Sequence, residues 1–170
     1  MSLKSQILSP EASEAPAIEL PVGRGGTWAR QHFRGQPVVL AFYPGDWEPV
    51  SADQLRSYNE VLPEIRRLGA ELVGASVDSV WCHEAFTRDL LLHFRLLSDF
   101  HPRGGAARAY GIYLPRKGFS ARAIFVIDAM GLIRWHYRGA FEVNPGVHGI
   151  LTALEALSQE QASTERDKPI

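Results

Sequence analysis

Hydrophobic residues form two nearly continuous runs in the first half of the chain. Residues 38–43 are all apolar or aromatic and precede Pro44–Gly45, and residues 71–77 (ELVGASV) form a second, mainly apolar run. A continuous apolar run that ends at turn residues is typical of a strand buried on both faces, as in a parallel sheet. These two runs therefore predict the centre of a β-sheet.

Helical periodicity separates the two predicted strands. Apolar side chains recur every three or four residues over residues 52–68, which predicts a helix. Pro63 lies inside this segment and should kink the helix, because proline has no backbone N–H. Gly69 should end the helix, because glycine readily adopts the left-handed conformation that follows many helix C-termini.

The rest of the chain continues the alternation of strands and helices. Periodicity and turn residues predict a helix over 80–92 with Asp78 or Ser79 as its N-cap, a strand over 95–97, a helix over 103–110, a β-hairpin over 123–128 and 132–137, and a helix over 147–157. Residues 17–20 and 27–33 are expected to form short strands or turns. This order of elements predicts an α/β fold with a mixed central sheet flanked by helices.

Both ends of the chain lack this periodicity. We therefore expect a flexible N-terminal arm at residues 1–15, a single domain at 16–158 and a flexible tail at 159–170. A length of 170 residues agrees with one domain.

Charge and composition narrow the possible partners. The 18 basic and 19 acidic residues leave a net charge of −1, and no run of five basic residues occurs, so nucleic acid is not an expected partner. No apolar run reaches the ~20 residues that cross a bilayer, and the first residues lack the apolar stretch of a signal peptide, so we expect a cytoplasmic protein without a membrane partner.

The single cysteine, Cys82, excludes an internal disulfide and a cysteine-based metal site. No histidine pair has metal-binding spacing, so we expect no metal.

The most informative segment is FYPGDWEPVSADQ at residues 42–54, which joins a predicted buried strand to a helix. Ligands of open α/β sheets bind at this kind of place, outside the carboxyl ends of the strands. Ser51 lies near the predicted helix start, where unpaired N–H groups stabilise an anion, so its position suits a nucleophile. A serine nucleophile, however, needs an adjacent base, and none is evident in the sequence. The alternative is that Ser51 only caps the helix, with Gln54 completing a capping box.

This segment resembles the active-site segment of peroxiredoxins, the alkyl hydroperoxide reductase C / thiol-specific antioxidant family. That family's motif has a proline, three residues, a threonine, two residues and the peroxidatic cysteine, with Glu or Gln three residues later. The resemblance continues through ASVDSVW, FRLLSDFHPRGGAARAYGIY and FSARAIFVIDAMGLIRWHYRG, and covers about residues 36–157. It implies a thioredoxin-like fold and a thiol-dependent antioxidant peroxidase that reduces hydrogen peroxide or organic hydroperoxides without a cofactor.

The resemblance also implies roles for individual residues. Ser51 falls on the peroxidatic cysteine, and Arg122 would hold the peroxide and favour a thiolate. Pro44 would shield and shape the pocket. Glu48 falls on the peroxide-contacting threonine, and Gln54 would orient Arg122.

Two of these positions depart from the family pattern. Glu48 brings a negative charge beside the position of the thiolate, which Arg122 would have to offset. Ser51 cannot be oxidised to a sulfenic acid, so the chain as it stands should not reduce peroxides by the family's mechanism. The chain is either an engineered Cys→Ser form, which the retention of Pro44, Gln54 and Arg122 favours, or a natural non-catalytic interaction protein with the same fold. A serine hydrolase is disfavoured, because Gly-x-Ser-x-Gly is absent around Ser51.

Cys82 lies in the first turns of the predicted helix over 80–92. Some peroxiredoxins place a resolving cysteine on this helix, where it condenses with the sulfenic acid to form a disulfide. The parent enzyme would then be recycled by a thioredoxin-like or other dithiol reductant. The alternative is a small buried hydrophobic residue beside Trp81 and Phe86. The resemblance further implies a homodimer.

Overall fold

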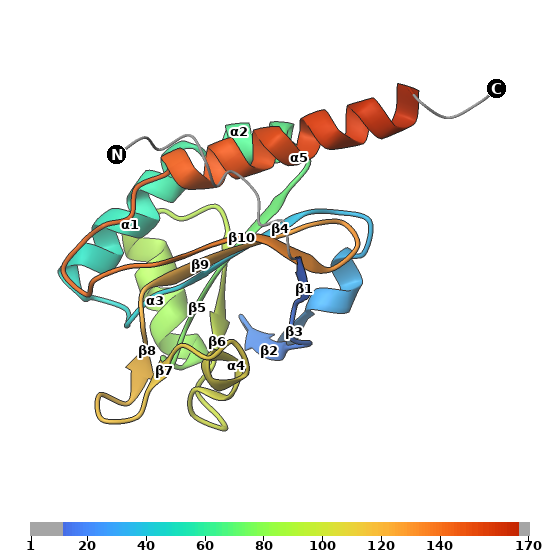
Figure 1. Cartoon of the computed structure of the whole chain (residues 1–170). Coiled ribbons are helices and arrows are strands. Elements are labelled where there is room, and N and C mark those ends of the chain that lie inside the picture. Colours follow the sequence, from blue (N-terminus) through green and yellow to red (C-terminus); the bar gives the residue numbers. More distant parts are fainter. Residues whose placement is uncertain (1–11, 167–170) are drawn as a thin grey trace.

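The computed structural model describes residues 12–166 and contains a six-stranded mixed sheet with the strand order β1-β10-β9-β4-β5-β6 (Figure 1). The strands are β1 (Ser13–Glu14), β4 (Val38–Phe42), β5 (Glu71–Ser76), β6 (Arg95–Ser98), β9 (Ala123–Ile127) and β10 (Leu132–Arg138). β4 lies at the centre, parallel to β5 and antiparallel to β9. The predicted central strands and the hairpin of β9 and β10 are confirmed, and with them the α/β fold with a mixed sheet.

Helices and two small hairpins surround the sheet. The helices are α1 (Pro49–Glu60), α2 (Leu62–Arg67), α3 (Val80–Leu90), α4 (Gly105–Ala109), α5 (His148–Arg166) and the 3₁₀ helix η1 (Arg30–Phe33). The hairpins are β2 (Glu19–Val22) with β3 (Gly26–Ala29), and β7 (Tyr113–Leu114) with β8 (Phe119–Ser120). No helix within residues 12–166 has the length and apolar character that a membrane span requires.

The central strand β4 separates two hydrophobic cores. All five of its residues are 0% exposed, and alternate side chains point to opposite faces of the sheet. Val39 and Ala41 pack in a core with α1, α2, α3 and α5. Val38, Leu40 and Phe42 pack in a core with α4 and the β2–β3 hairpin. The continuous apolar run is explained by this burial on both faces.

The predicted kinked helix over residues 52–68 is wrong in both its start and its continuity. α1 begins at Pro49 and ends at Glu60, and α2 begins at Leu62. Val61 joins them with a non-helical φ of −95° and ψ of 4°. Pro63 occupies the first turn of α2, where its missing N–H costs nothing, so the proline separates two helices instead of bending one. The predicted end at Gly69 is confirmed, with a φ of +78°.

Parts of the expected arm and tail form regular secondary structure within the described residues. Ser13 and Glu14 pair with β10 as an edge strand, so part of the predicted arm belongs to the sheet. α5 continues to Arg166, beyond the predicted start of the tail at residue 159. Its last two turns are polar and exposed, and Glu160 forms an ion pair with Arg134 of β10. Residues 1–11 and 167–170 of the predicted arm and tail lie outside the described residues.

Candidate active site

The loop between β4 and α1 lies where the parallel strands β4 and β5 end. Pro44 is buried two residues after the end of β4, while Trp47 adopts a left-handed φ of +65° and is 52% exposed. A bulky residue rarely adopts such a φ, so the loop has a defined shape between its buried proline and the start of α1. This shape places Glu48 at the N-cap of α1.

Glu48, not Ser51, caps the helix. Its Oε1 accepts a hydrogen bond from the N–H of Val50 at 3.0 Å, and its Oε2 accepts one from the N–H of Ser51 at 2.8 Å. Pro49 suits the first helical position, so α1 begins three residues earlier than the apolar periodicity indicates. The interpretation of Ser51 as an N-cap in a capping box with Gln54 is therefore wrong, and Ser51 lies inside the first turn.

Arg122 lies between β8 and β9 and reaches the first turn of α1 from the start of β9, the strand next to β4. Its Nη1 donates to the Oγ of Ser51 at 3.2 Å and to the Oε1 of Gln54 at 2.7 Å. Its Nη2 donates to the Oε2 of Glu48 at 2.9 Å. The structure thus brings together four of the predicted site residues, which come from two segments about 70 residues apart in the chain.

The guanidinium of Arg122 is held from a second side by the backbone of Phe141. Its Nε and Nη2 donate to the carbonyl oxygen of Phe141 at 3.2 and 2.7 Å. The side chain of Arg122 is 0% exposed, so its charge depends on these acceptors and on Glu48. Phe141 was not anticipated from the sequence, because a carbonyl acceptor carries no residue-type signal.

Gln54 is fixed by a partner on the next turn of α1. Its Nε2 donates to the Oη of Tyr58 at 2.8 Å, which leaves its Oε1 facing Arg122. Burial raises the pKa of Tyr58 well above the ordinary value, so this phenol stays neutral. Gln54 therefore connects a buried phenol to the buried guanidinium.

The hydroxyl of Ser51 donates to the Oε2 of Glu48 at 2.6 Å. Burial raises the pKa of Glu48, but hydrogen bonds from Ser51, Arg122 and Val50 lower it by more, so its pKa lies below the ordinary value. The carboxylate is therefore charged, and both of its oxygens already accept hydrogen bonds. For this reason it is a weak base toward the serine hydroxyl.

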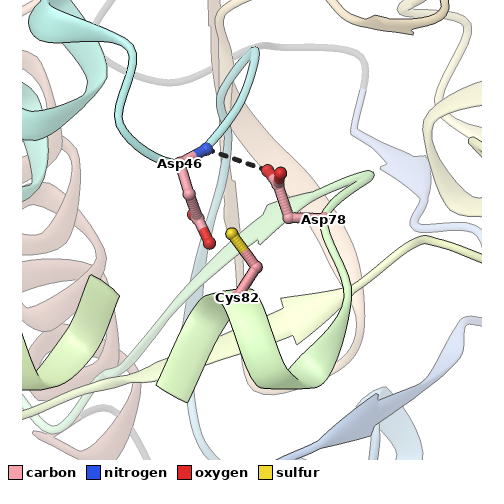
Figure 2. A group of neighbouring side chains, drawn as sticks. All are labelled: Asp46, Asp78 and Cys82. Carbon is pink, nitrogen blue, oxygen red and sulfur yellow. Dashed lines mark hydrogen bonds between the residues drawn. The ribbon is translucent and has the colours of Figure 1, made fainter. Parts of the chain in front are cut away.

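Cys82 occupies a separate cluster with Asp46 and Asp78, where its Sγ points toward the two carboxylates (Figure 2). One ligand atom from each of the three residues lies within 4.8 Å of the others. Burial, followed by the charge of Asp46, raises the pKa of the Cys82 thiol to about 11. Ser79 caps α3 by accepting a hydrogen bond from the N–H of Cys82 at 3.3 Å, which confirms one of the two predicted caps.

The carboxylates beside Cys82 are already hydrogen-bonded within the protein. Asp46 accepts from the Oη of Tyr43 at 2.8 Å and contacts the Nδ1 of His83 at 2.8 Å. Asp78 accepts from the N–H of Asp46 at 2.8 Å and from the Oγ of Ser76 at 2.6 Å (Figure 2). The cluster is therefore a hydrogen-bonded connection between the β4–α1 loop and α3.

His83 is a buried member of this network that sequence reasoning did not single out. Its Nδ1 faces Asp46, and its Nε2 lies 3.1 Å from the carbonyl oxygen of Leu97. These contacts join α3 to the β4–α1 loop on one side and to β6 on the other.

Comparisons with known proteins place these features in context. The profile of the AhpC/TSA family matches residues 12–136. The chain is 33% identical to a selenocysteine-containing peroxiredoxin from Peptoclostridium acidaminophilum over 153 residues, which cover 84% of this chain and 74% of that protein. It is 30% identical to peroxiredoxins from Thermoplasma volcanium and Thermoplasma acidophilum, with matches that cover 74% of this chain and 64% and 65% of those proteins. The matched part thus spans just under two thirds of these two relatives.

Two solved structures share the fold. The reduced 2-Cys peroxiredoxin of Plasmodium vivax matches with a TM-score of 0.82 and 24% identity, over 89% of this chain and 83% of that chain. AhpC of Enterococcus faecalis matches with a TM-score of 0.81 and 20% identity, over 94% of this chain and 97% of that chain. These likenesses confirm the expected thioredoxin-like α/β fold.

Proposed function

We propose that this chain, which belongs to the AhpC/TSA family of peroxiredoxins, carries a hydroperoxide-reducing site in which serine replaces the reactive cysteine. With cysteine at position 51 the site would reduce hydrogen peroxide or organic hydroperoxides. With Ser51 the chain would keep the pocket but lack the thiol that the reaction consumes. The two forms differ in one side-chain atom of residue 51, which is sulfur in cysteine and oxygen in serine.

The observation that carries the proposal is the buried contact between Arg122 and the side chain of residue 51. The Nη1 of Arg122 lies 3.2 Å from the Oγ of Ser51, and Ser51 lies in the first turn of a 12-residue helix. A guanidinium and the positive end of a helix dipole both stabilise an anion at that place. They would lower the pKa of a thiol there, which is the requirement for a reactive cysteine.

The reaction then balances without a cofactor. A thiolate at position 51 attacks one oxygen of the O–O bond, an S–O bond forms and the O–O bond breaks. The second oxygen leaves as water or an alcohol after it takes up a proton, and the cysteine becomes a sulfenic acid. A dithiol reductant, such as a thioredoxin-like protein, would return the sulfenic acid to the thiol. Ser51 has no corresponding oxidised state.

A resolving role for Cys82 remains part of this proposal for the cysteine form. Its raised pKa makes it a poor attacking thiolate in the arrangement described, so disulfide formation would require Cys82 to leave Asp46 and Asp78. A cytoplasmic location and a homodimer complete the proposal, and both are inferred from the sequence and the family resemblance.

A second candidate is a non-catalytic interaction protein, and one observation favours it. Ser51 and Glu48 form a closed pair, because the hydroxyl donates to the carboxylate at 2.6 Å. Cysteine would place its sulfur against the same negative charge. Trp47 and Trp81, which are 52% and 76% exposed, would offer aromatic surface to a partner protein.

A serine hydrolase finds little support in this geometry, although Glu48 contacts the serine hydroxyl. The hydrogen bonds that lower the pKa of Glu48 weaken it as a base. The N–H groups of Val50 and Ser51 are engaged by Glu48, so they are not available to stabilise an oxyanion.

The test is the Ser51→Cys variant, assayed for hydroperoxide consumption with a dithiol reductant. We expect consumption above that of the Ser51 chain, and loss of the gain when Arg122→Gln is added. The variant Ser51→Cys/Cys82→Ser shows whether Cys82 takes part in the cycle. A folded Ser51→Cys protein as inert as the Ser51 chain contradicts the peroxidase proposal and favours the interaction protein. The genomic codon for residue 51 separates an engineered from a natural serine.

A further inference from the structure

Four hydrogen-bond donors converge on the carboxylate of Glu48. The N–H of Val50 donates to Oε1 at 3.0 Å. The N–H of Ser51 at 2.8 Å, the Oγ of Ser51 at 2.6 Å and the Nη2 of Arg122 at 2.9 Å all donate to Oε2. Helix amides and an arginine that aim at one point form an anion site, and here the anion belongs to the chain itself.

Burial shows which member of this group faces the solvent. Ser51 is 0% exposed and so is the side chain of Arg122, whereas the side chain of Glu48 is 20% exposed. Glu48 is therefore the one of these three side chains that the solvent reaches. Because its carboxylate is hydrogen-bonded to Arg122, a ligand that takes this place on Arg122 must displace it.

The charge of Arg122 makes Glu48 more than a helix cap. An N-cap needs only to accept from amides at the start of a helix. Glu48 is also the one carboxylate at ion-pair distance from Arg122 among residues 12–166. Without it, a fully buried guanidinium would face the helix N-terminus with no counter-charge, which is a costly arrangement.

We propose that Glu48 is an internal ligand that fills an oxyanion site, and that removal of its side chain lets a small external carboxylate bind in its place. Formate is the simplest probe, because it has two acceptor oxygens and one negative charge, as the Glu48 carboxylate has. The inference deepens the proposed function, because the filled site includes the contact between Arg122 and residue 51. It identifies Glu48 as the residue that controls ligand access.

The test uses the Ser51 chain and needs no peroxidase activity. Glu48→Ala and Glu48→Ser each remove the carboxylate, and the serine variant keeps an oxygen that can cap α1. Formate binding is measured by calorimetry and by the midpoint of thermal unfolding. We expect both variants to bind formate at least tenfold more tightly than the parent chain. At about ten times the dissociation constant, formate should raise their unfolding midpoints by about 3 °C or more.

Two controls separate this site from general salt effects. Glu64→Ala removes an exposed carboxylate that pairs with Arg67 on α2, and it should bind formate no better than the parent chain. Adding Arg122→Gln to Glu48→Ser should abolish the gained binding. If folded Glu48→Ser binds formate no better than the parent chain or Glu64→Ala, the internal-ligand proposal is overturned. That result would leave the peroxidase proposal intact, because the latter depends on the Ser51→Cys assay.

Discussion

The pocket around Ser51 and the cluster around Cys82 are similar in composition but differ in charge, because the first pairs its carboxylate with a buried guanidinium and the second contains two carboxylates. Each holds a nucleophile-type side chain in the first turn of a helix, next to a carboxylate. At position 51 the side chain contacts both the buried Arg122 and the carboxylate that Arg122 pairs with, Glu48. At position 82 the neighbours are Asp46 and Asp78, and the pKa of the thiol is raised to about 11. A helix start therefore does not by itself make a thiol reactive, because the other charges around it decide.

The largest effect is expected from removal of the positive charge of Arg122, which contacts Ser51. Arg122→Leu leaves the partly buried Glu48 without its ion-pair partner and removes the hydrogen bonds to Gln54 and Phe141. Breaking a buried pair on one side typically costs about 3 kcal/mol or more. We expect a loss of that size in the free energy of unfolding, measured with urea.

The exposed pair of Arg67 and Glu64 supplies the matched control for this variant. Arg67→Leu should leave the urea midpoint nearly unchanged, because exposed ion pairs contribute little. Equal urea midpoints for Arg122→Leu and Arg67→Leu would contradict the expectation that the buried ion pair contributes more to stability than the exposed one.

Removal of a negative charge beside Cys82 should make the electrostatic environments of Ser51 and Cys82 more similar. Burial is the first cause of the raised pKa of Cys82, and the charge of Asp46 is the next. Asp46→Asn should therefore lower this pKa by about one unit, a tenfold gain in thiolate below it. The pH dependence of alkylation with iodoacetamide measures the change.

Asp78→Asn is the graded control, because Asp78 follows Asp46 among the causes of the shift. It should lower the pKa of Cys82 by less. An unchanged pKa in both variants would mean that burial alone keeps the thiol protonated.

A smaller effect is expected at the start of α3. Ser79 accepts the hydrogen bond from the N–H of Cys82, and loss of such a cap costs about 1 kcal/mol. Ser79→Ala should lower the free energy of unfolding by that amount, while Ser79→Asp should preserve it. If Ser79→Asp loses as much unfolding free energy as Ser79→Ala, the capping hydrogen bond is not what Ser79 contributes to stability.

The smallest effect concerns acid stability. The folded-state pKa of Glu48 is lowered because its hydrogen bonds outweigh its burial, so Glu48 stabilises the fold above its unfolded-state pKa of about 4.3. That contribution is lost as the pH falls through the folded-state pKa. The difference in unfolding free energy between the parent chain and Glu48→Gln should therefore shrink from about pH 6 to about pH 3. A constant difference would contradict the assignment of a charged Glu48.

The sequence was most informative where the physical signal is local. β4 and β5 follow the two apolar runs to within one residue, because strands buried on both faces leave no polar alternation. α5 was predicted too short, because its exposed polar end has no apolar face and gains contacts such as Arg134–Glu160 from outside the helix. The proximity of Ser51, Gln54 and Arg122 was expected only through the family motif.

Other features of the site depend on how separate segments meet in space. Glu48 takes the cap position that sequence spacing gave to Ser51, because Pro49 begins the helix earlier. The Asp46–His83 contact joins a loop to α3, and nothing in the spacing of these residues indicates it. The environment of Cys82 was unpredictable for the same reason.

The central claim is that position 51, and not position 82, is where a thiol would react with a hydroperoxide. Ser51→Cys contains both thiols in one protein, so brief treatment with substoichiometric hydrogen peroxide, followed by trapping of sulfenic acid with dimedone and peptide mass spectrometry, compares them directly. We predict that the label appears on the residue introduced at position 51, while Cys82 stays unlabelled. A label found first on Cys82, or equally on both, would contradict the account.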